Sequence, residues 1–245
     1  MKGKTIVVWF SCGAASAVAA KLTLEKYGKD NQVLIVNNPI KEEDIDNVRF
    51  KRDMEKWIKQ PVIEATNPEF PEASICEVFA RKKYMSGVKG APCTLMLKKM
   101  ARYYFERTHQ VDYHVLGFTH DEQDRHERFT KYERANVIPV LIDAGITKVD
   151  CIKILHDAGI KLPNIYSMGY PNANCVGCVK ATSPTYWNLV RKTHPKVFAS
   201  RAKQSREIGC RLVRVKGQRI FLDQLDPEAI GGKIKSYECG IFCDL

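Results

Sequence analysis

Two cysteines three positions apart are the feature of this sequence best suited to chemistry. They are Cys175 and Cys178, in the segment NANCVGCVKA (172–181). Thiols at this spacing can form a redox pair, bind a zinc ion or an iron–sulfur cluster, or pack as ordinary core residues. The flanking Gly, Asn and Pro residues predict a loop that wraps a metal, whereas a redox pair usually opens a helix after a strand. These alternatives stay open on spacing alone.

The composition favours metal or redox chemistry for the cysteines. Nine cysteines are present, and an odd, high count in a reducing compartment argues against a disulfide framework. No apolar run approaches the roughly 20 residues that span a bilayer. The first ten residues lack the longer apolar stretch and cleavage site of a signal peptide. We therefore expect a cytoplasmic protein with no membrane partner.

The charge balance predicts an anionic partner. The net charge is +11, from 39 Lys and Arg against 28 Asp and Glu. The basic residues gather at 81–102 and 201–219. Such clusters are typical of proteins that bind nucleic acid or nucleotides carrying phosphate or sulfate.

The elements that position these residues alternate between strands and helices. Short β-branched runs predict buried strands at 5–10, 32–38, 61–66 and 111–119. Longer amphipathic segments predict helices at 17–28 and 47–60. This order predicts an α/β fold, a parallel twisted sheet flanked by helices. Residues 1–200 are expected to form one nucleotide-binding domain. Residues 201–245 are expected to add a basic extension, a hairpin over 210–222 and a cysteine-bearing tail, without forming an independent domain.

The turn after the first predicted strand is the expected ligand site, because ligands of parallel sheets bind at the carboxyl ends of the strands. Small residues there let backbone amides and the following helix N-terminus approach an anion. The candidate phosphate-binding residues are Ser11, Cys12, Gly13, Ala14, Ala15 and Ser16.

The segment FSCGAASAVAAKL (10–22) is similar to the modified phosphate loop of the adenine nucleotide α-hydrolase (PP-loop) superfamily. Cys12 and Ala15 depart from the pattern of its ATP-cleaving members. They resemble the branch that includes phosphoadenylyl sulfate (PAPS) and adenylyl sulfate (APS) reductases. The resemblance implies a Rossmann-like fold and an adenine nucleotide as ligand, with Val36 and Asn37 near the adenine.

Cys93, in GAPCTLMLKK (90–99), followed by the distant pair Cys175 and Cys178, resembles the cluster-binding pattern of APS reductases and related sulfur-insertion enzymes. The resemblance implies a [4Fe–4S] cluster, with zinc as the lesser alternative. Cys243 is the candidate for a fourth ligand. Lys98 is expected to lower the pKa of the nearby thiol and offset cluster charge, and we count it among the residues around the nucleotide's anionic groups.

The C-terminal SYECGIFCDL resembles the tail of sulfonucleotide reductases. The resemblance implies that Cys239 is the nucleophile that attacks the sulfur of the nucleotide, and that a thioredoxin-like donor then releases sulfite. The alternatives are a disordered tail that bears two exposed thiols, or a redox pair of Cys239 with Cys243.

The segment GFTHDEQDRHER (117–128) lies where this family carries basic residues for the substrate's sulfate and phosphate. Arg125, His126 and Arg128 fit that role by charge. Thr119 stands where the reductases usually have Arg, which weakens the case for a strict PAPS reductase.

Three hypotheses follow for the function. The preferred one is a sulfonucleotide reductase-like enzyme that binds APS or PAPS and reduces it through Cys239. The alternative keeps the fold and the cluster but inserts sulfur into tRNA or DNA after activation by ATP, which the basic 201–219 segment favours. The third is a zinc-stapled module that binds nucleic acid.

Overall fold

A computed structural model describes residues 1–87, 90–232 and 234 of the chain. The chain divides into two compact units, each assembled from separate segments. The first unit comprises Met1–Pro39, Ile45–Ala65 and Arg102–Asn164, and the second comprises Ile40–Asp44, Thr66–Ala101 and Ile165–Leu245. The division into domains at residue 200 stays a prediction.

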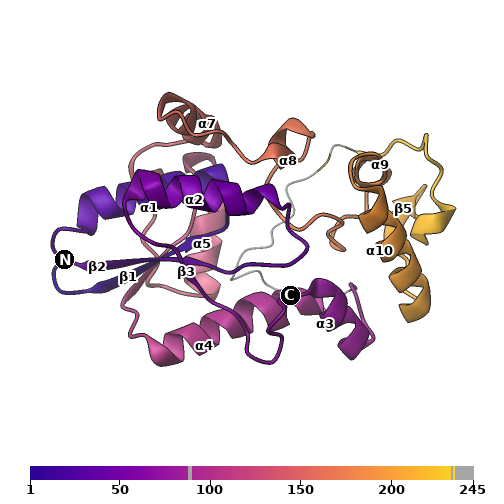
Figure 1. Ribbon diagram of the computed structural model, residues 1–245, viewed down its shortest axis with the longest axis horizontal. Helices are drawn as coiled ribbons and strands as arrows, with labels where there is room; N and C mark the ends of the chain where they lie inside the picture. The colour runs from indigo at the N-terminus through magenta and orange to yellow at the C-terminus, as the bar shows by residue number, and fades with distance from the viewer. Residues whose placement is uncertain (88–89, 233, 235–245) are drawn as a thin grey trace. The chain divides into compact units, whose positions relative to one another are not determined.

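A four-stranded parallel sheet organises the first unit (Figure 1). Its strands are β1 (Thr5–Phe10), β2 (Gln32–Asn37), β3 (Ile63–Glu64) and β4 (Tyr113–Val115). They lie in the order β3-β2-β1-β4, so β1 is central and pairs with β2 on one side and β4 on the other. The predicted parallel α/β sheet is confirmed.

The central strand β1 buries both of its faces because its residues alternate between two helical layers. Ile6, Val8 and Phe10 pack into one apolar cluster with residues of the helices on the first face. Trp9 points to the opposite face, where its ring meets the ring of Phe105 edge-on at 5.7 Å. A nearly continuous apolar run is therefore what this strand position requires.

Helix α1 (Ala14–Tyr27) packs closely on the sheet because the side chains of its buried face are small. Ala17, Ala19 and Ala20 are almost fully buried. Gly28 forms the C-cap, as the sequence predicts. The other helices with residues in this unit are α2 (Asp46–Ile58), α4 (Met100–Thr108), η2 (His120–Glu122), α5 (Gln123–Tyr132), α6 (Val140–Asp143), α7 (Lys148–Asp157) and α8 (Asn164–Ser167).

The second unit packs short helices and a hairpin around a core of its own. Its elements are α3 (Ile75–Lys82), the π-helical turn η1 (Thr94–Lys99), α9 (Pro184–Thr193), α10 (Pro195–Ile208), β5 (Val213–Val215), β6 (Gln218–Ile220) and η3 (Leu222–Gln224). Strands β5 and β6 form the antiparallel hairpin that the sequence predicts.

The helices α7 and α9 (Pro184–Thr193) begin in different ways. Thr147 and Asp150 form a capping box at the start of α7. Pro184 opens α9 after Ser183, but the Ser183 hydroxyl donates to the carbonyl of Gly232 and does not cap the helix. Within the described residues, no helix is both long and apolar enough to cross a membrane.

Candidate functional site

A serine pair closes the turn between β1 and α1. The Ser16 hydroxyl accepts a hydrogen bond from the Ser11 amide (3.1 Å), lies 3.2 Å from the Ser11 hydroxyl and donates to the Gly13 carbonyl (3.0 Å). Gly13 occupies the N-cap position and has no side chain with which to cover the amides of the first helical turn. The backbone amides at a helix start are the groups that bind phosphate in such turns.

Gly117, just beyond β4, lies against the start of α1. A Cβ at this position would come within 2.8 Å of the Ser16 amide nitrogen and 3.0 Å of the Ala15 carbonyl carbon. Only glycine allows this approach without displacing the backbone. Sequence analysis missed Gly117, although a glycine directly after a parallel strand is the signal that could have found it.

Cys12 and Asn37 support the turn from inside the first unit. Cys12 has a left-handed backbone (φ 55°) that directs its thiol inward, and the residue is 3 % exposed. Asn37 Nδ2 donates to the Phe10 carbonyl (2.8 Å) and lies 3.7 Å from Cys12 Sγ. Val36 is fully buried. Cys12 can therefore contribute to anion binding only through its backbone, and the adenine contacts of Val36 and Asn37 stay predictions.

The predicted basic residues of the first unit lie on α5. Arg125 donates to Glu122 (2.6 Å) and covers the Phe118 ring at 5.0 Å. His126 meets the same ring edge-on, and burial lowers the pKa of its imidazole. Arg128 is exposed, and its Nε contacts the carbonyl of residue 124 at 3.4 Å. Their contact with sulfate or phosphate stays a prediction.

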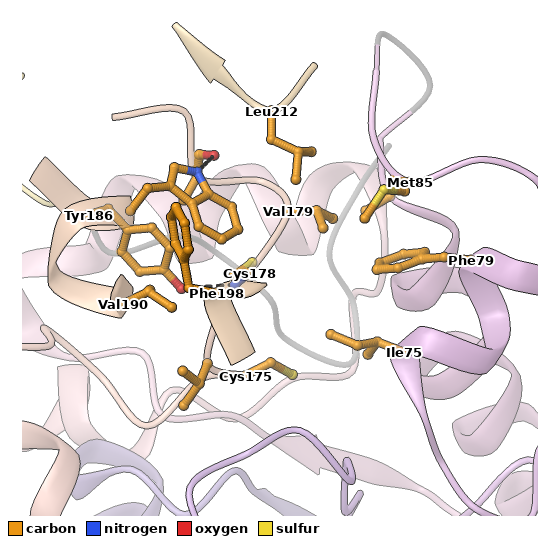
Figure 2. Close-up of a cluster of buried hydrophobic side chains, with 14 of the residues drawn as sticks. Ile75, Phe79, Met85, Cys175, Cys178, Val179, Tyr186, Val190, Phe198 and Leu212 are labelled. Carbon is orange, nitrogen blue, oxygen red and sulfur yellow. Dashed lines mark hydrogen bonds between the residues drawn. The ribbon is translucent and has the colours of Figure 1, made fainter. Parts of the chain in front are cut away.

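The CVGC loop lies in the core of the second unit (Figure 2). Gly177 turns the loop with φ 71°. The Cys178 amide donates to the Tyr186 hydroxyl at 2.8 Å, and the Val176 amide donates to the Glu42 carbonyl at 2.9 Å. These bonds hold the backbone between the two cysteines, as a loop that presents two thiols requires.

Both thiols of the loop have apolar surroundings. Cys175 and Cys178 are each 7 % exposed. Figure 2 shows them between side chains of α9 and α10 on one side and side chains of α3 on the other, namely Tyr186, Val190, Phe198, Ile75 and Phe79. Burial is the largest cause that raises the pKa of the Tyr186 hydroxyl well above its usual value, and the two thiols add to it. Tyr186 therefore stays neutral at physiological pH.

Cys93 reaches the same core from another segment. It is the N-cap of η1, whose π-helical bond runs from the Met100 amide to the Leu95 carbonyl. Its side chain is half-buried and packs against the core cluster that contains Cys175 and Cys178. Lys98, on the same turn, is only 7 % exposed. π-Helical turns are rare in proteins, and those that occur are often found at functional sites.

The described residues do not form a site for a single metal ion. No three Cys, His, Asp or Glu side chains among them converge closely enough to hold one. Cys239 and Cys243, the predicted nucleophile and fourth ligand, lie outside the described residues.

A buried arginine beside the cysteines is a feature that sequence analysis missed. Arg201 on α10 is 2 % exposed, and its Nη1 lies 3.6 Å from Cys76 Sγ and 2.7 Å from Gln204 Oε1. Its Nε has no hydrogen-bond partner in the described part of the chain and would lie 3.9 Å from a Cβ at Gly177. Burial raises the pKa of the Cys76 thiol, and the charge of Arg201 opposes that rise. The buried helical spacing 198, 201, 202, 205 is the signal that could have found Arg201.

Comparisons with known proteins bear on the fold. No protein-family model matches the chain, and no curated protein matches it. Among solved structures, it is similar to the U34-tRNA thiolase NcsA from Methanococcus maripaludis with its [4Fe–4S] cluster. The TM-score is 0.50 at 12% identity, over 98% of this chain and 80% of that one. At this identity the likeness shows the fold, and it confirms the expected α/β fold with a parallel sheet flanked by helices.

Proposed function

We propose that this protein is a PP-loop enzyme that transfers sulfur to tRNA, with an adenine nucleotide as activating substrate and a [4Fe–4S] cluster as cofactor. The observation that carries the proposal is the placement of three thiols. Cys93 lies far from Cys175 and Cys178 in the chain, yet all three pack in or against the same hydrophobic core of the second unit. One similar solved structure is that of a U34-tRNA thiolase with its [4Fe–4S] cluster.

Three thiols are donors that either a zinc ion or a four-iron cluster accepts. A zinc ion needs its ligands to converge on one point, whereas each thiolate of a four-iron cluster binds a different iron, so the sulfurs stand further apart. Cys93, Cys175 and Cys178 would hold the cluster. Bound by these three thiolates, a cluster would supply the sulfur-transfer chemistry of the reaction. Arg201 and Lys98 are buried cations of the same unit, and they suit an anionic cluster.

The turn of residues 11–16 would bind the phosphates of the nucleotide. Its serine pair fixes the backbone. The amides at the start of α1 lie at the positive end of the helix dipole, which favours an anion. In the proposed reaction, a base oxygen attacks the α-phosphorus of ATP and pyrophosphate leaves. Sulfide then replaces that oxygen, and AMP leaves. The chain itself orients the nucleotide.

Sulfonucleotide reduction is the competing function. Ala15 supports it, since ATP-cleaving relatives carry an acidic residue at this place in the loop. It would require attack by Cys239 on APS or PAPS and a thioredoxin-like donor. The thiolase likeness supports sulfur transfer more than this reduction.

The test is a comparison of substrates on one anaerobic preparation. We expect the protein to release pyrophosphate from ATP when tRNA is present, and to form thiolated tRNA when sulfide is added. A Ser11→Ala, Ser16→Ala variant should lose pyrophosphate release and keep its iron. Sulfite release from APS or PAPS that is lost in Cys239→Ser, without any thiolated tRNA, would contradict the proposal.

A further inference from the structure

The β5–β6 hairpin of the second unit has one covered and one exposed face. Val213 is buried, and Arg214 and Arg219 are exposed. The tight turn consists of Lys216 (φ 48°) and Gly217 (φ 83°), both in the left-handed region that such two-residue hairpin turns need. The ladder is short, so the hairpin depends on its packed face for stability.

Two arginines stand opposite each other on the exposed face. Arg214 pairs directly with Arg219 in the antiparallel register. Like charges at directly opposed positions destabilise a hairpin. No Asp or Glu occurs anywhere in residues 208–222 to offset them. The strands therefore hold two positive charges together at a cost to stability in the free protein.

The basic surface continues around an aromatic ring. The guanidinium groups of Arg206 and Arg211 lie 4.0 Å and 5.4 Å from the centre of the Phe221 ring. Arg219 donates to the carbonyl of Arg211 at 3.3 Å, which keeps the two residues adjacent. Arg206 is the one cation here with a carboxylate partner in the described part of the chain, Asp223 at 2.8 Å.

We propose that the exposed face of this hairpin, made of Arg211, Arg214, Lys216 and Arg219, binds the phosphate backbone of tRNA. The inference rests on the proposed function for the choice of tRNA. Arginine forks match phosphate oxygens, and a phosphate between Arg214 and Arg219 removes the repulsion between them. The Phe221 ring, with the guanidinium groups of Arg206 and Arg211 over it, holds two further cations beside this face.

The test replaces the opposed pair and measures tRNA binding over a range of salt concentrations. In Arg214→Gln, Arg219→Gln, we expect affinity for tRNA to fall roughly 10-fold or more at low salt, and the slope of log affinity against log salt to shrink by about 1 to 2. Thermal stability should stay equal or rise, because the like-charge pair is gone. The matched control is Arg52→Gln, Lys56→Gln, which removes two exposed cations from α2 and should change the affinity much less.

The outcomes separate this inference from the proposed function. An unchanged affinity and slope in the hairpin variant would overturn the hairpin site, whether or not the parent protein thiolates tRNA. Loss of tRNA binding with normal pyrophosphate release from ATP and a shorter RNA substrate would support the site. A parent protein that binds duplex DNA or an acidic peptide through the same arginines, and not tRNA, would overturn the choice of partner.

Discussion

The guanidinium of Arg201 contacts the Cys76 thiol and lies beside Gly177 of the CVGC loop, within the second unit. Its Nη1 lies 3.6 Å from Cys76 Sγ, and its Nε would lie 3.9 Å from a Cβ at Gly177. The protein groups that it contacts by hydrogen bond are neutral, and its ring contact is with Phe79 at 5.2 Å. Arg201 forms no ion pair with a described residue, and a buried cation without an anionic partner is costly, so the proposed anionic cluster would give Arg201 a physical role.

Replacing Arg201 by methionine should weaken cluster retention and leave the metal-free fold intact. We expect iron per chain to fall to roughly half or less, because a buried compensating charge is lost. The free energy of unfolding of the metal-free protein should stay within about 1 kcal/mol of the parent or rise, as buried charges often destabilise. Iron analysis and urea unfolding measure the two effects.

The matched control for this change is Arg201→Lys, which keeps the charge. It should retain more iron than Arg201→Met. Equal iron in all three proteins would show that Arg201 does not serve the cluster.

Alanine at Gly117 should disturb the turn before α1. Its Cβ would collide with the Ser16 amide nitrogen at 2.8 Å, so the backbone has to shift. We expect a loss of about 1–3 kcal/mol in the free energy of unfolding and weaker binding of adenine nucleotide, measured by calorimetry. Gly232→Ala is the control, since no atom lies within 4 Å of its added Cβ. Unchanged nucleotide binding in Gly117→Ala would count against the turn as the nucleotide site.

His114 should make the stability of the protein depend on pH. Burial is the largest cause that lowers its pKa, to about 3, and the charges of Arg134 and Arg102 add to it. A depressed pKa means that the folded state holds His114 neutral, so stability is present above about 6.5 and lost as pH falls toward about 3. Between pH 6.5 and 5, before most carboxylates titrate, the loss approaches 1.4 kcal/mol per pH unit.

The variant His114→Gln isolates this contribution. Its free energy of unfolding should change less over that interval than the parent's, whatever its absolute stability. Urea unfolding at several pH values gives both slopes, and parallel slopes would remove His114 as the cause.

The sequence predicts the first unit better than the second, for a physical reason. Strand and helix periods around β1 and α1 are local signals, and the turn at 11–16 follows from strand order. The second unit brings residues 40–44, 66–101 and 165 onward together, which no local pattern encodes. The inward turn of the Cys12 thiol depends on a left-handed backbone, and the burial of Arg201 depends on packing between distant segments.

The site shows the same division. Spacing and resemblance predict Cys93, Cys175 and Cys178 as ligands. In the structure all three lie in or against the hydrophobic core of the second unit. Cys76 and Arg201 carry no motif. Helical spacing could place Arg201 on the buried face of α10, but its contact with Cys76 depends on the packing of α3 and α10 in the same unit.

The most direct test of the central claim is the iron and sulfide content of the anaerobically purified protein and its cysteine variants. The account predicts about four irons per chain in the parent and loss of iron in Cys93→Ala, Cys175→Ala and Cys178→Ala. Cys151→Ala is the control, because that thiol is buried in the first unit and burial raises its pKa to about 12. Zinc in place of iron, or full iron in the three variants, would contradict it.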